Sequence, residues 1–204
     1  MKLNEINNEK SYLGKRGYIL KKELLTNEEL DKIRKDLTVK PNVLNNFNDN
    51  VKSFKVYLEN KKKIYIPKFY GNNKFGEACV NKIPEGLDID LNFVFKLRDD
   101  QNYPVQKALD NYNKLGGGIL HLQTGFGKTI IACHLISKMK KKTLVIVHKE
   151  FLLDQWVERI NQSLPGARIG IIQGNKFDIE DKDIVIGMLQ TIWSKKFPLN
   201  AFYS

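Results

Sequence analysis

Residues 122–129 hold the side chains of this sequence that are best suited to bind phosphate. They read Leu-Gln-Thr-Gly-Phe-Gly-Lys-Thr. Gly125 and Gly127 can turn successive backbone N–H groups inward around phosphate oxygens. Lys128 can reach the β- and γ-phosphates of a nucleoside triphosphate, and the Thr129 hydroxyl is a ligand for Mg²⁺. The predicted site for ATP and Mg²⁺ consists of Gln123, Thr124, Gly125, Phe126, Gly127, Lys128 and Thr129.

This loop departs from the strict phosphate-loop pattern G-x-x-x-x-G-K-[ST] at its first position. Leu122 stands where that pattern has glycine. The alternative interpretation is a glycine-rich turn in which Lys-Thr occurs by coincidence. The context favours phosphate binding, because an apolar strand is predicted over 119–122 and a helix over 128–140. The positive end of that helix would face the phosphates.

The elements around the loop alternate between strand and helix patterns. A helix is predicted over 104–114, with Pro104 near its first turn. Strands are predicted over 143–147, 168–172 and 183–187, and a helix over 150–163. This alternation predicts an α/β fold with a parallel sheet built from βαβ units. In that fold the loop joins a strand to the helix that follows it.

The first part of the chain predicts a small α+β module. Residues 17–23 alternate enough for a short strand. Thr26 and Glu29 have the spacing of a capping box, which starts a helix that Pro41 ends.

Residues 54–58 and 64–70 alternate on both sides of a polar link and predict a β-hairpin. The Gly- and Pro-bearing stretch after them places a domain boundary near 86–96. We therefore expect one domain over 1–96 and a second over 97–204.

Composition limits the class of protein. The chain has 34 Lys and Arg against 23 Asp and Glu, a net charge of +11. Such a chain attracts polyanions at moderate salt, although a solvated lysine-rich surface gives the same composition. No apolar run approaches the ~20 residues that cross a bilayer, so we expect no membrane partner. Cys79 and Cys133 are far apart, which favours a reducing intracellular compartment over a disulfide scaffold or metal cluster.

The loop and the residues before it resemble superfamily 2 helicases and translocases. Thr124-Gly-Phe-Gly-Lys-Thr129 after an apolar strand resembles motif I of that superfamily. Leu97-Arg-Asp-Asp-Gln101 resembles the Leu-Arg-x-x-Gln motif that precedes such lobes. The resemblance implies a RecA-like first motor lobe in which Gln101 reads the adenine edge. Gln106 is a rival for that role, and the sequence leaves the choice open.

Motifs after the loop extend the resemblance. The segment from Leu144 to Trp156 resembles motif Ia, although His148 stands where proline is usual. The resemblance implies that Lys149 faces nucleic-acid phosphate, whereas we expect Trp156 to pack in the core. Two later segments resemble the next two motifs, which touch the tracking strand through backbone amides and a threonine hydroxyl. The residues of these two motifs are Gln173, Gly174, Gln190 and Thr191.

A narrower resemblance concerns the branch of the superfamily. Gly117-Gly-Ile-Leu, motif I and the helix with Gln155 and Trp156 resemble the branch of the xeroderma pigmentosum group B helicase and phage branch-migrating helicases. Asp36–Pro41 and Ile64–Gly71 resemble the N-terminal module of helicases from large cytoplasmic DNA viruses, of the poxvirus transcript-release type. This implies a location in the cytoplasm, or in the virion or virus factory if the protein is viral, and DNA in preference to RNA as the partner. It suggests transcription as the pathway, and the sequence leaves repair and replication open.

ATP hydrolysis by such a motor needs a carboxylate pair, normally Asp-Glu at the end of a later strand. No Asp-Glu pair follows Thr191, and Asp181 and Asp183 precede a strand, which is the wrong end for this role. We therefore expect a part of a longer helicase, or a natural truncation, that binds ATP weakly and hydrolyses it negligibly. The alternatives are a kinase-like phosphate-loop enzyme and a nucleotide- and nucleic-acid-binding module without catalysis.

Overall fold

The computed structural model describes residues 11–40 and 52–195, and the chain divides into two compact units, Met1–Pro84 and Glu85–Ser204. The parallel sheet predicted from the sequence is in the second unit, and its α/β fold confirms the predicted fold class. None of the helices in the described part of the chain is long and apolar enough to cross a membrane.

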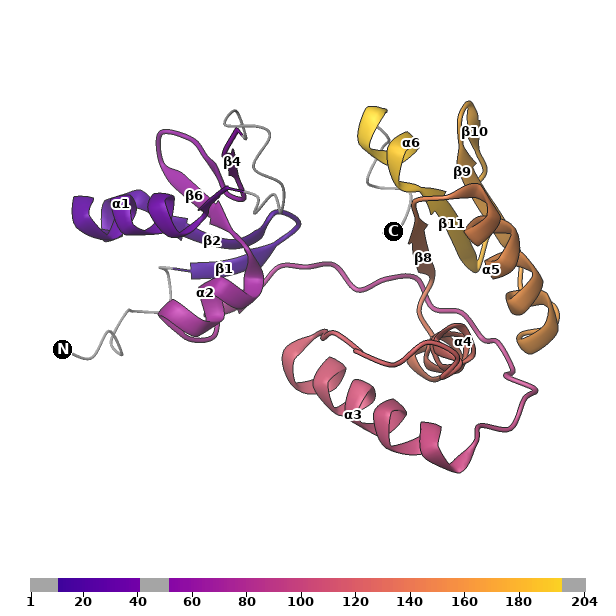
Figure 1. Ribbon diagram of the computed structural model, residues 1–204. Coiled ribbons are helices and arrows are strands. Elements are labelled where there is room, and N and C mark those ends of the chain that lie inside the picture. Colours follow the sequence, from indigo (N-terminus) through magenta and orange to yellow (C-terminus); the bar gives the residue numbers. More distant parts are fainter. Residues whose placement is uncertain (1–10, 41–51, 196–204) are drawn as a thin grey trace, which may run out of the picture. The chain divides into compact units, whose positions relative to one another are not determined.

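The first unit is built on a five-stranded sheet with the strand order β5-β6-β2-β1-β7. Figure 1 labels its strands β6, β2 and β1. Its strands are β1 (Ser11–Gly14), β2 (Gly17–Lys21), β5 (Leu58–Glu59), β6 (Lys63–Ile66) and β7 (Val80–Asn81). A separate two-stranded sheet pairs β3 (Thr38–Val39) with β4 (Phe54–Lys55). The helices are the 3-10 helix η1 (Lys22–Leu24), α1 (Asn27–Asp36) and α2 (Lys68–Phe75).

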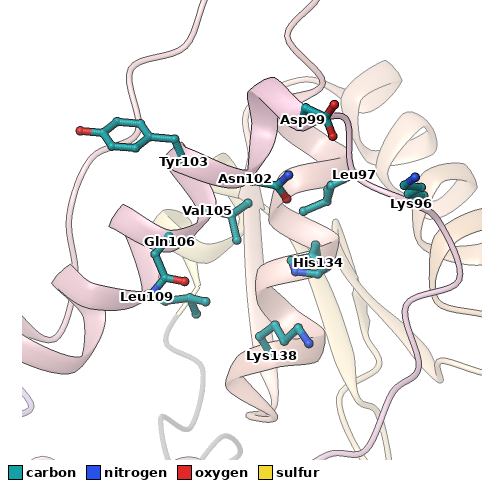
Figure 2. Close-up of a pocket in the computed structure, with 10 residues that line it drawn as sticks. All are labelled: Lys96, Leu97, Asp99, Asn102, Tyr103, Val105, Gln106, Leu109, His134 and Lys138. Atoms are coloured by element: carbon teal, nitrogen blue, oxygen red, sulfur yellow. The ribbon is translucent and has the colours of Figure 1, made fainter.

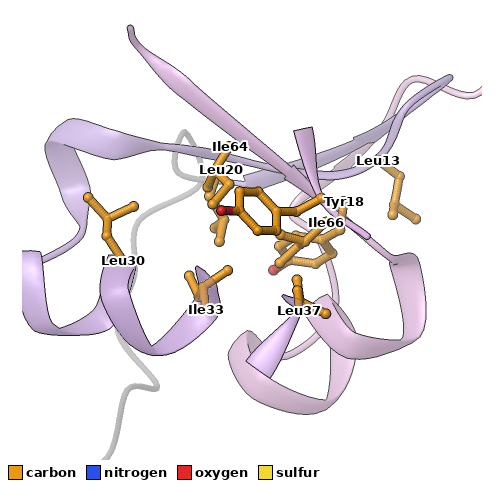
Figure 3. Close-up of a cluster of buried hydrophobic side chains, with 9 residues drawn as sticks. Leu13, Tyr18, Leu20, Leu30, Ile33, Leu37, Ile64 and Ile66 are labelled. Atoms are coloured by element: carbon orange, nitrogen blue, oxygen red, sulfur yellow. The ribbon is translucent and has the colours of Figure 1, made fainter. Parts of the chain in front are cut away.

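Helix α1 begins at the predicted capping box. The Thr26 hydroxyl accepts a hydrogen bond from the Glu29 amide at 3.1 Å, and the Glu29 carboxylate accepts one from the Thr26 amide at 2.8 Å. The apolar side chains of α1 are spaced at three and four residues, so they point to one side. Figure 3 shows them between the helix and the sheet, against side chains of β1, β2 and β6. The core side chains in that view include Leu13, Tyr18, Leu20, Leu30, Ile33, Leu37, Ile64 and Ile66.

The predicted hairpin over 54–58 and 64–70 was wrong in its extent. The antiparallel pair joins β5 to β6 through Leu58 and Tyr65, whereas Phe54 pairs with Val39. Residues 67–70 do not continue the strand, because Pro67 precedes α2 as its N-cap residue. Proline has no N–H for a sheet ladder and suits the start of a helix, so the strand ends there.

Gly71 lets α2 approach the sheet, because it has no side chain at the point of closest contact. A Cβ at Gly71 would lie 2.3 Å from Cγ of the buried Tyr18 ring. A Gly71→Ala protein should therefore lose about 1–3 kcal/mol of stability in the first unit, as in other overpacked cores. Faster amide hydrogen exchange in the β2 and β6 peptides would report this loss. Gly86→Ala is the control, since its Cβ would have its nearest neighbour at 3.9 Å; equal exchange in both variants would contradict the prediction.

The second unit contains a four-stranded sheet with the order β10-β9-β11-β8. Strand β11 is parallel to both β8 and β9, as the sequence predicts, while the short β10 is antiparallel to β9. The strands are β8 (Thr143–Val147), β9 (Ile169–Gln173), β10 (Lys176–Phe177) and β11 (Ile184–Met188). The helices are α3 (Asp99–Leu115), α4 (Lys128–Met139), α5 (Glu150–Ser163) and α6 (Leu189–Ser194).

Two predictions before the phosphate loop were wrong. Helix α3 begins at Asp99, so Pro104 lies inside the helix and not near its first turn. The strand predicted over 119–122 is not formed, and Ile119 is 96% exposed. A strand exists through the hydrogen bonds of a partner. In the part of the chain that the structure describes, no strand pairs with 119–122, so apolar composition alone does not make this segment a strand.

The core of the second unit lies between its sheet and the helices α4 and α5. Fully buried side chains come from the sheet and from both helices: Cys133 on α4, Ile160 on α5 and Ile186 on β11. Trp156 is partly buried against this cluster, as predicted. Residues 85–96 run along the same unit: the Ile89 amide donates to the Lys140 carbonyl and the Val94 amide to the Ser163 carbonyl, both at 3.0 Å.

Candidate nucleotide and nucleic-acid site

The phosphate loop has the backbone geometry that its glycines predict. Gly125 and Gly127 have φ values of 81° and 85°, in the left-handed region that favours glycine. Gly127 is the N-cap of α4, and no side chain of the described residues caps the amides of the first turn. No acidic residue lies in that turn either. The free N–H groups and the positive end of the helix are therefore available to an anion.

Lys128 is directed at the loop itself. Its ammonium donates to the carbonyl oxygens of Leu122 and Gln123, both at 2.8 Å. Among the described residues it forms no ion pair, and its side chain is exposed. A phosphate would offer a charged acceptor in place of these neutral carbonyls, and bonds between charged partners are stronger. The donors fit the phosphates of a nucleotide, and Thr129, next in the first turn of α4, supplies the hydroxyl for Mg²⁺.

The structure brings Gln101 to the loop. Its side chain is 3% exposed, and its amide nitrogen donates to the Phe126 carbonyl at 2.9 Å. Its amide oxygen accepts from the Arg98 backbone N–H at 3.0 Å. Arg98 also donates to the Phe126 carbonyl at 3.1 Å, with its guanidinium 5.6 Å from the Phe126 ring centroid. Our sequence reasoning gave Arg98 no role, although it lies inside the Leu-Arg-x-x-Gln motif.

Gln106, the rival for the adenine role, lies elsewhere. It lines a pocket of about 670 Å³ with residues of α3 and α4 (Figure 2). Its amide donates to Asp110 at 2.9 Å. His134 lines the same pocket, packed edge-on against Phe93 with ring centroids 4.8 Å apart. Its Nδ1 is buried and has no hydrogen-bond partner among the described residues. Burial, followed by the charge of Lys138, lowers the pKa of His134, so the ring is neutral at pH 7.

The later motifs meet where the parallel strands end. The Gly174 amide, after β9, donates to the Thr191 hydroxyl oxygen at 3.1 Å, and Thr191 follows β11. The Gln190 amide donates to the carbonyl of His148, after β8, at 2.8 Å. Ligands of open parallel sheets bind at this carboxyl edge. Three segments that are far apart in the sequence thus present polar groups at one edge.

Two charged contacts extend this edge. Gln173 donates to the Glu150 carboxylate at 2.9 Å, and Lys149 is the exposed N-cap residue of α5. Lys195 donates to the Gly174 carbonyl and to the Asn175 side chain. We did not predict Lys195 from the sequence as a residue of this edge. Its spacing from Thr191 could have indicated it, because residues four apart lie on the same side of a helix.

Asp183 lies at the opposite, amino end of β11, as its sequence position predicts. It is 6% exposed and accepts three hydrogen bonds from Arg168: from the backbone N–H at 2.8 Å, from Nε at 3.1 Å and from Nη2 at 2.7 Å. The hydrogen bonds from the Arg168 side chain, above all, lower the pKa of Asp183. This carboxylate joins the start of two strands and does not face the phosphate loop. In residues 11–40 and 52–195 there is no cluster of three metal-ligating side chains.

A phosphate loop that opens a helix beside a parallel sheet, with polar groups at the carboxyl ends of the strands, defines a RecA-like nucleotide-binding lobe. Residues 94–201, more than half of the chain, match the family described as "Type III restriction enzyme, res subunit". The chain belongs to that family. Its relatives support the superfamily 2 helicase class.

Two viral proteins are among these relatives. One, from Acanthamoeba polyphaga mimivirus, is provisionally named an ATP-dependent RNA helicase and is 35% identical over 191 residues, which are 91% of this chain and 37% of that protein. Another, from Invertebrate iridescent virus 3, is provisionally named a helicase and is 38% identical over 84 residues, 41% of this chain and 26% of that protein. The chain thus spans little more than a third of the mimivirus protein and about a quarter of the other.

The fold is also similar to the crystal structure of the UvsW helicase from Bacteriophage T4. The TM-score is 0.53 at 18% sequence identity, over 84% of this chain and 72% of that chain. At this identity the likeness concerns the fold, and it agrees with a RecA-like lobe.

Proposed function

We propose that this chain is the ATP- and nucleic-acid-binding part of an ATP-dependent helicase or translocase of the xeroderma pigmentosum group B-like branch, with the viral transcript-release type as its nearest pattern. One observation carries the proposal: the start of α4, two left-handed glycines and Lys128 form one phosphate cradle, with Gln101 hydrogen-bonded to its Phe126. Among the described residues no side chain caps that helix start and no carboxylate pairs with Lys128. The family match and the viral relatives support it.

The residues of the phosphate cradle would bind ATP and Mg²⁺ as follows. Loop amides, Lys128 and the start of α4 would hold the phosphates, and Thr129 would ligate Mg²⁺ through its hydroxyl. We assign the adenine edge to Gln101 because its bond to Phe126 places it at the loop, whereas Gln106 is bonded to Asp110. Bound Mg²⁺ would neutralise charge on the phosphates.

The carboxyl edge of the sheet is the proposed nucleic-acid surface. Exposed Lys149 would contact a phosphate, and the Gly174–Thr191 pair offers a backbone segment and a hydroxyl at one point. Gln173 and Gln190 complete the surface, each bonded to the segment that follows β8. We propose DNA as the preferred partner. We also propose that the first domain, residues 1–96, binds nucleic acid.

Measuring nucleic-acid binding by variants of this edge tests the proposal. The purified chain should bind single-stranded DNA, and a Lys149→Ala, Thr191→Val double variant should bind it about tenfold more weakly. The loss reflects one phosphate contact and one hydroxyl contact. Fluorescence anisotropy at several salt concentrations, with RNA of the same sequence in parallel, measures both affinity and preference. Binding by wild type and variant that cannot be distinguished would sink the assignment of this edge.

A second candidate is nucleotide binding without catalysis by these 204 residues. The placement of the carboxylates favours this candidate. Among the described residues no carboxylate forms an ion pair with Lys128, and Asp183 is held by Arg168 at the amino end of β11. ATP turnover by the purified chain, with and without single-stranded DNA, separates the candidates. Robust turnover stimulated by nucleic acid would refute both this candidate and a kinase-like enzyme.

A further inference from the structure

One row of side chains crosses the whole sheet of the first unit on the face away from its helices. The strand register aligns one residue from each strand: Val80, Tyr12, Ile19, Tyr65 and Leu58. Successive side chains of a strand point to opposite faces, so this row lies opposite the core of Figure 3, where α1 and α2 pack. With strands ~4.8 Å apart, the row is about 19 Å long.

The side chains at the two ends of the row are exposed to solvent, and the one in the middle is buried. Leu58 and Val80 are 60% and 43% exposed, and Tyr12 and Tyr65 are half-buried. Ile19, between the two tyrosines, is 4% exposed although it belongs to none of the buried clusters. The two rings form a platform about two strand spacings across.

Cations surround the two tyrosines. The Arg16 guanidinium lies 5.4 Å from the Tyr65 ring centroid. The ammonium groups of Lys82 and Lys63 lie 4.8 and 5.3 Å from the Tyr12 ring centroid, and Lys63 also donates to the Tyr12 hydroxyl at 3.0 Å. This hydrogen bond, first of all, raises the pKa of Lys63, so its charge is retained at neutral pH.

The charge arrangement beside the row opposes folding. Lys21 and Lys63 lie directly opposite each other on β2 and β6, and like charges in that position destabilise a sheet. No ion pair within the described ranges engages either lysine. The carboxylate of neighbouring Glu59 is held instead by Lys22 and Arg34. A bound polyanion would remove this repulsion.

A pocket adjoins the row at Tyr65. It has a volume of about 230 Å³, and none of the residues that line it is acidic. Arg16 and Lys55 supply its cations, and Tyr65 and Leu58 connect it to the row. Positive charge next to an aromatic wall suits a nucleobase with its phosphate.

We propose that this surface, which we name the tyrosine platform, binds single-stranded nucleic acid. The platform consists of the row Val80, Tyr12, Ile19, Tyr65 and Leu58 and the cations Arg16, Lys21, Lys63 and Lys82. Bases stack on Tyr12 and Tyr65, and phosphates lie against the cations. Unpaired bases are required, because a duplex hides the faces of its bases. The inference rests on the proposed nucleic-acid-dependent function and specifies the surface and the form of the ligand.

Removing an aromatic face tests the stacking. In the full chain, Tyr65→Leu should weaken binding of a single-stranded 20-mer about 5- to 100-fold, the range for loss of one base stack. Tyr65→Phe keeps the ring and should bind like the wild type. Fluorescence anisotropy with DNA, RNA and a DNA duplex of the same sequence measures this. Loss on DNA, RNA or both supports the platform and identifies the ligand, whereas equal loss on duplex overturns the stacking.

Reversing one charge gives a test that unfolding cannot imitate. Lys21→Glu would place a carboxylate opposite Lys63, so the melting temperature should rise while affinity for the single strand falls about tenfold. Lys32→Glu, on the exposed side of α1, makes the same change in net charge and should leave affinity near that of the wild type. Lower affinity with unchanged or higher stability cannot come from a damaged fold.

The outcomes separate this inference from the function on which it rests. A wild-type chain that binds no nucleic acid would refute both. A wild-type chain that binds single strands, with Tyr65→Leu and Lys21→Glu equal to it, would overturn the tyrosine platform and leave the proposed function standing. ATP affinity should be unchanged in every platform variant, because none of these residues belongs to the phosphate cradle.

Discussion

A Lys128→Ala chain is expected to bind ATP about 10- to 100-fold more weakly than the wild type and to melt at the same temperature. The lost ammonium would otherwise bond the phosphates, and a hydrogen bond to a charged group is worth about 1.5–3 kcal/mol. The fold should tolerate the change, because the side chain is exposed and bonds only the carbonyls of Leu122 and Gln123 among the described residues. Titration with a fluorescent ATP analogue and Mg²⁺ measures the affinity.

Lys107→Ala is the matched control for this change. Lys107 is exposed on α3, and its ammonium lies 5.7 Å from the Tyr103 ring centroid. Among the described residues no hydrogen bond or ion pair joins it to residues 122–129. Lys107→Ala removes the same positive charge as Lys128→Ala, so a general electrostatic effect on ATP affinity would appear in both variants. If Lys128→Ala and Lys107→Ala bound the analogue equally well, the loop would not be the nucleotide site.

Replacing Asp183 by Asn should lower the free energy of unfolding of the second unit by about 1–3 kcal/mol. The buried carboxylate accepts three hydrogen bonds from Arg168, whose own side chain is 60% exposed, so the cost is that of weakened hydrogen bonds to one buried charged group. Asparagine can accept some of these bonds, which places the cost below that of removing the side chain. Both tryptophans, Trp156 and Trp193, lie in the second unit, so their fluorescence in a denaturant titration follows its unfolding.

The same carboxylate predicts how stability depends on pH. The Arg168 hydrogen bonds lower the pKa of Asp183 in the folded protein, so its contribution is present above the unfolded value of about 4. It is lost as the pH falls through the lower, folded value. The wild type should therefore lose stability below about pH 4 more steeply than Asp183→Asn does.

Asp90→Asn provides the comparison for both measurements. Asp90 pairs with Lys140, but its side chain is 89% exposed, and such surface pairs contribute at most about 1 kcal/mol. A loss in Asp183→Asn no larger than that in Asp90→Asn would show that the buried Asp183 carboxylate does not hold the strands together.

Local patterns predicted most of the regular elements. The capping box at Thr26, helix α4, helix α5 and the three parallel strands were read from spacing, because periodicity and capping act over a few residues. The glycine-rich loop was also predictable, since positive φ at Gly125 and Gly127 is a property of glycine itself. These features need no knowledge of distant contacts.

Two of the failures concern features that depend on a distant partner. The apolar stretch over 119–122 had the composition of a strand, but pairing decides whether a strand forms. The segment over 54–58 was predicted to pair as one hairpin, yet Phe54 pairs with Val39 and Leu58 with Tyr65. In both cases hydrogen bonds to another segment fix the result, and local sequence does not encode which segment that is.

The sequence by itself determined the phosphate loop, the α/β class and the resemblance to helicases, because short motifs and periodic patterns carry them. The tertiary structure decided what those motifs contact: Gln101 at the loop, Thr191 on Gly174, and Asp183 on Arg168 at the other end of the sheet. It also decided that Tyr12 and Tyr65, 53 positions apart by their numbers (65 − 12), share one row of a sheet. Strand register creates that row, and register belongs to the folded chain and not to any one segment of it.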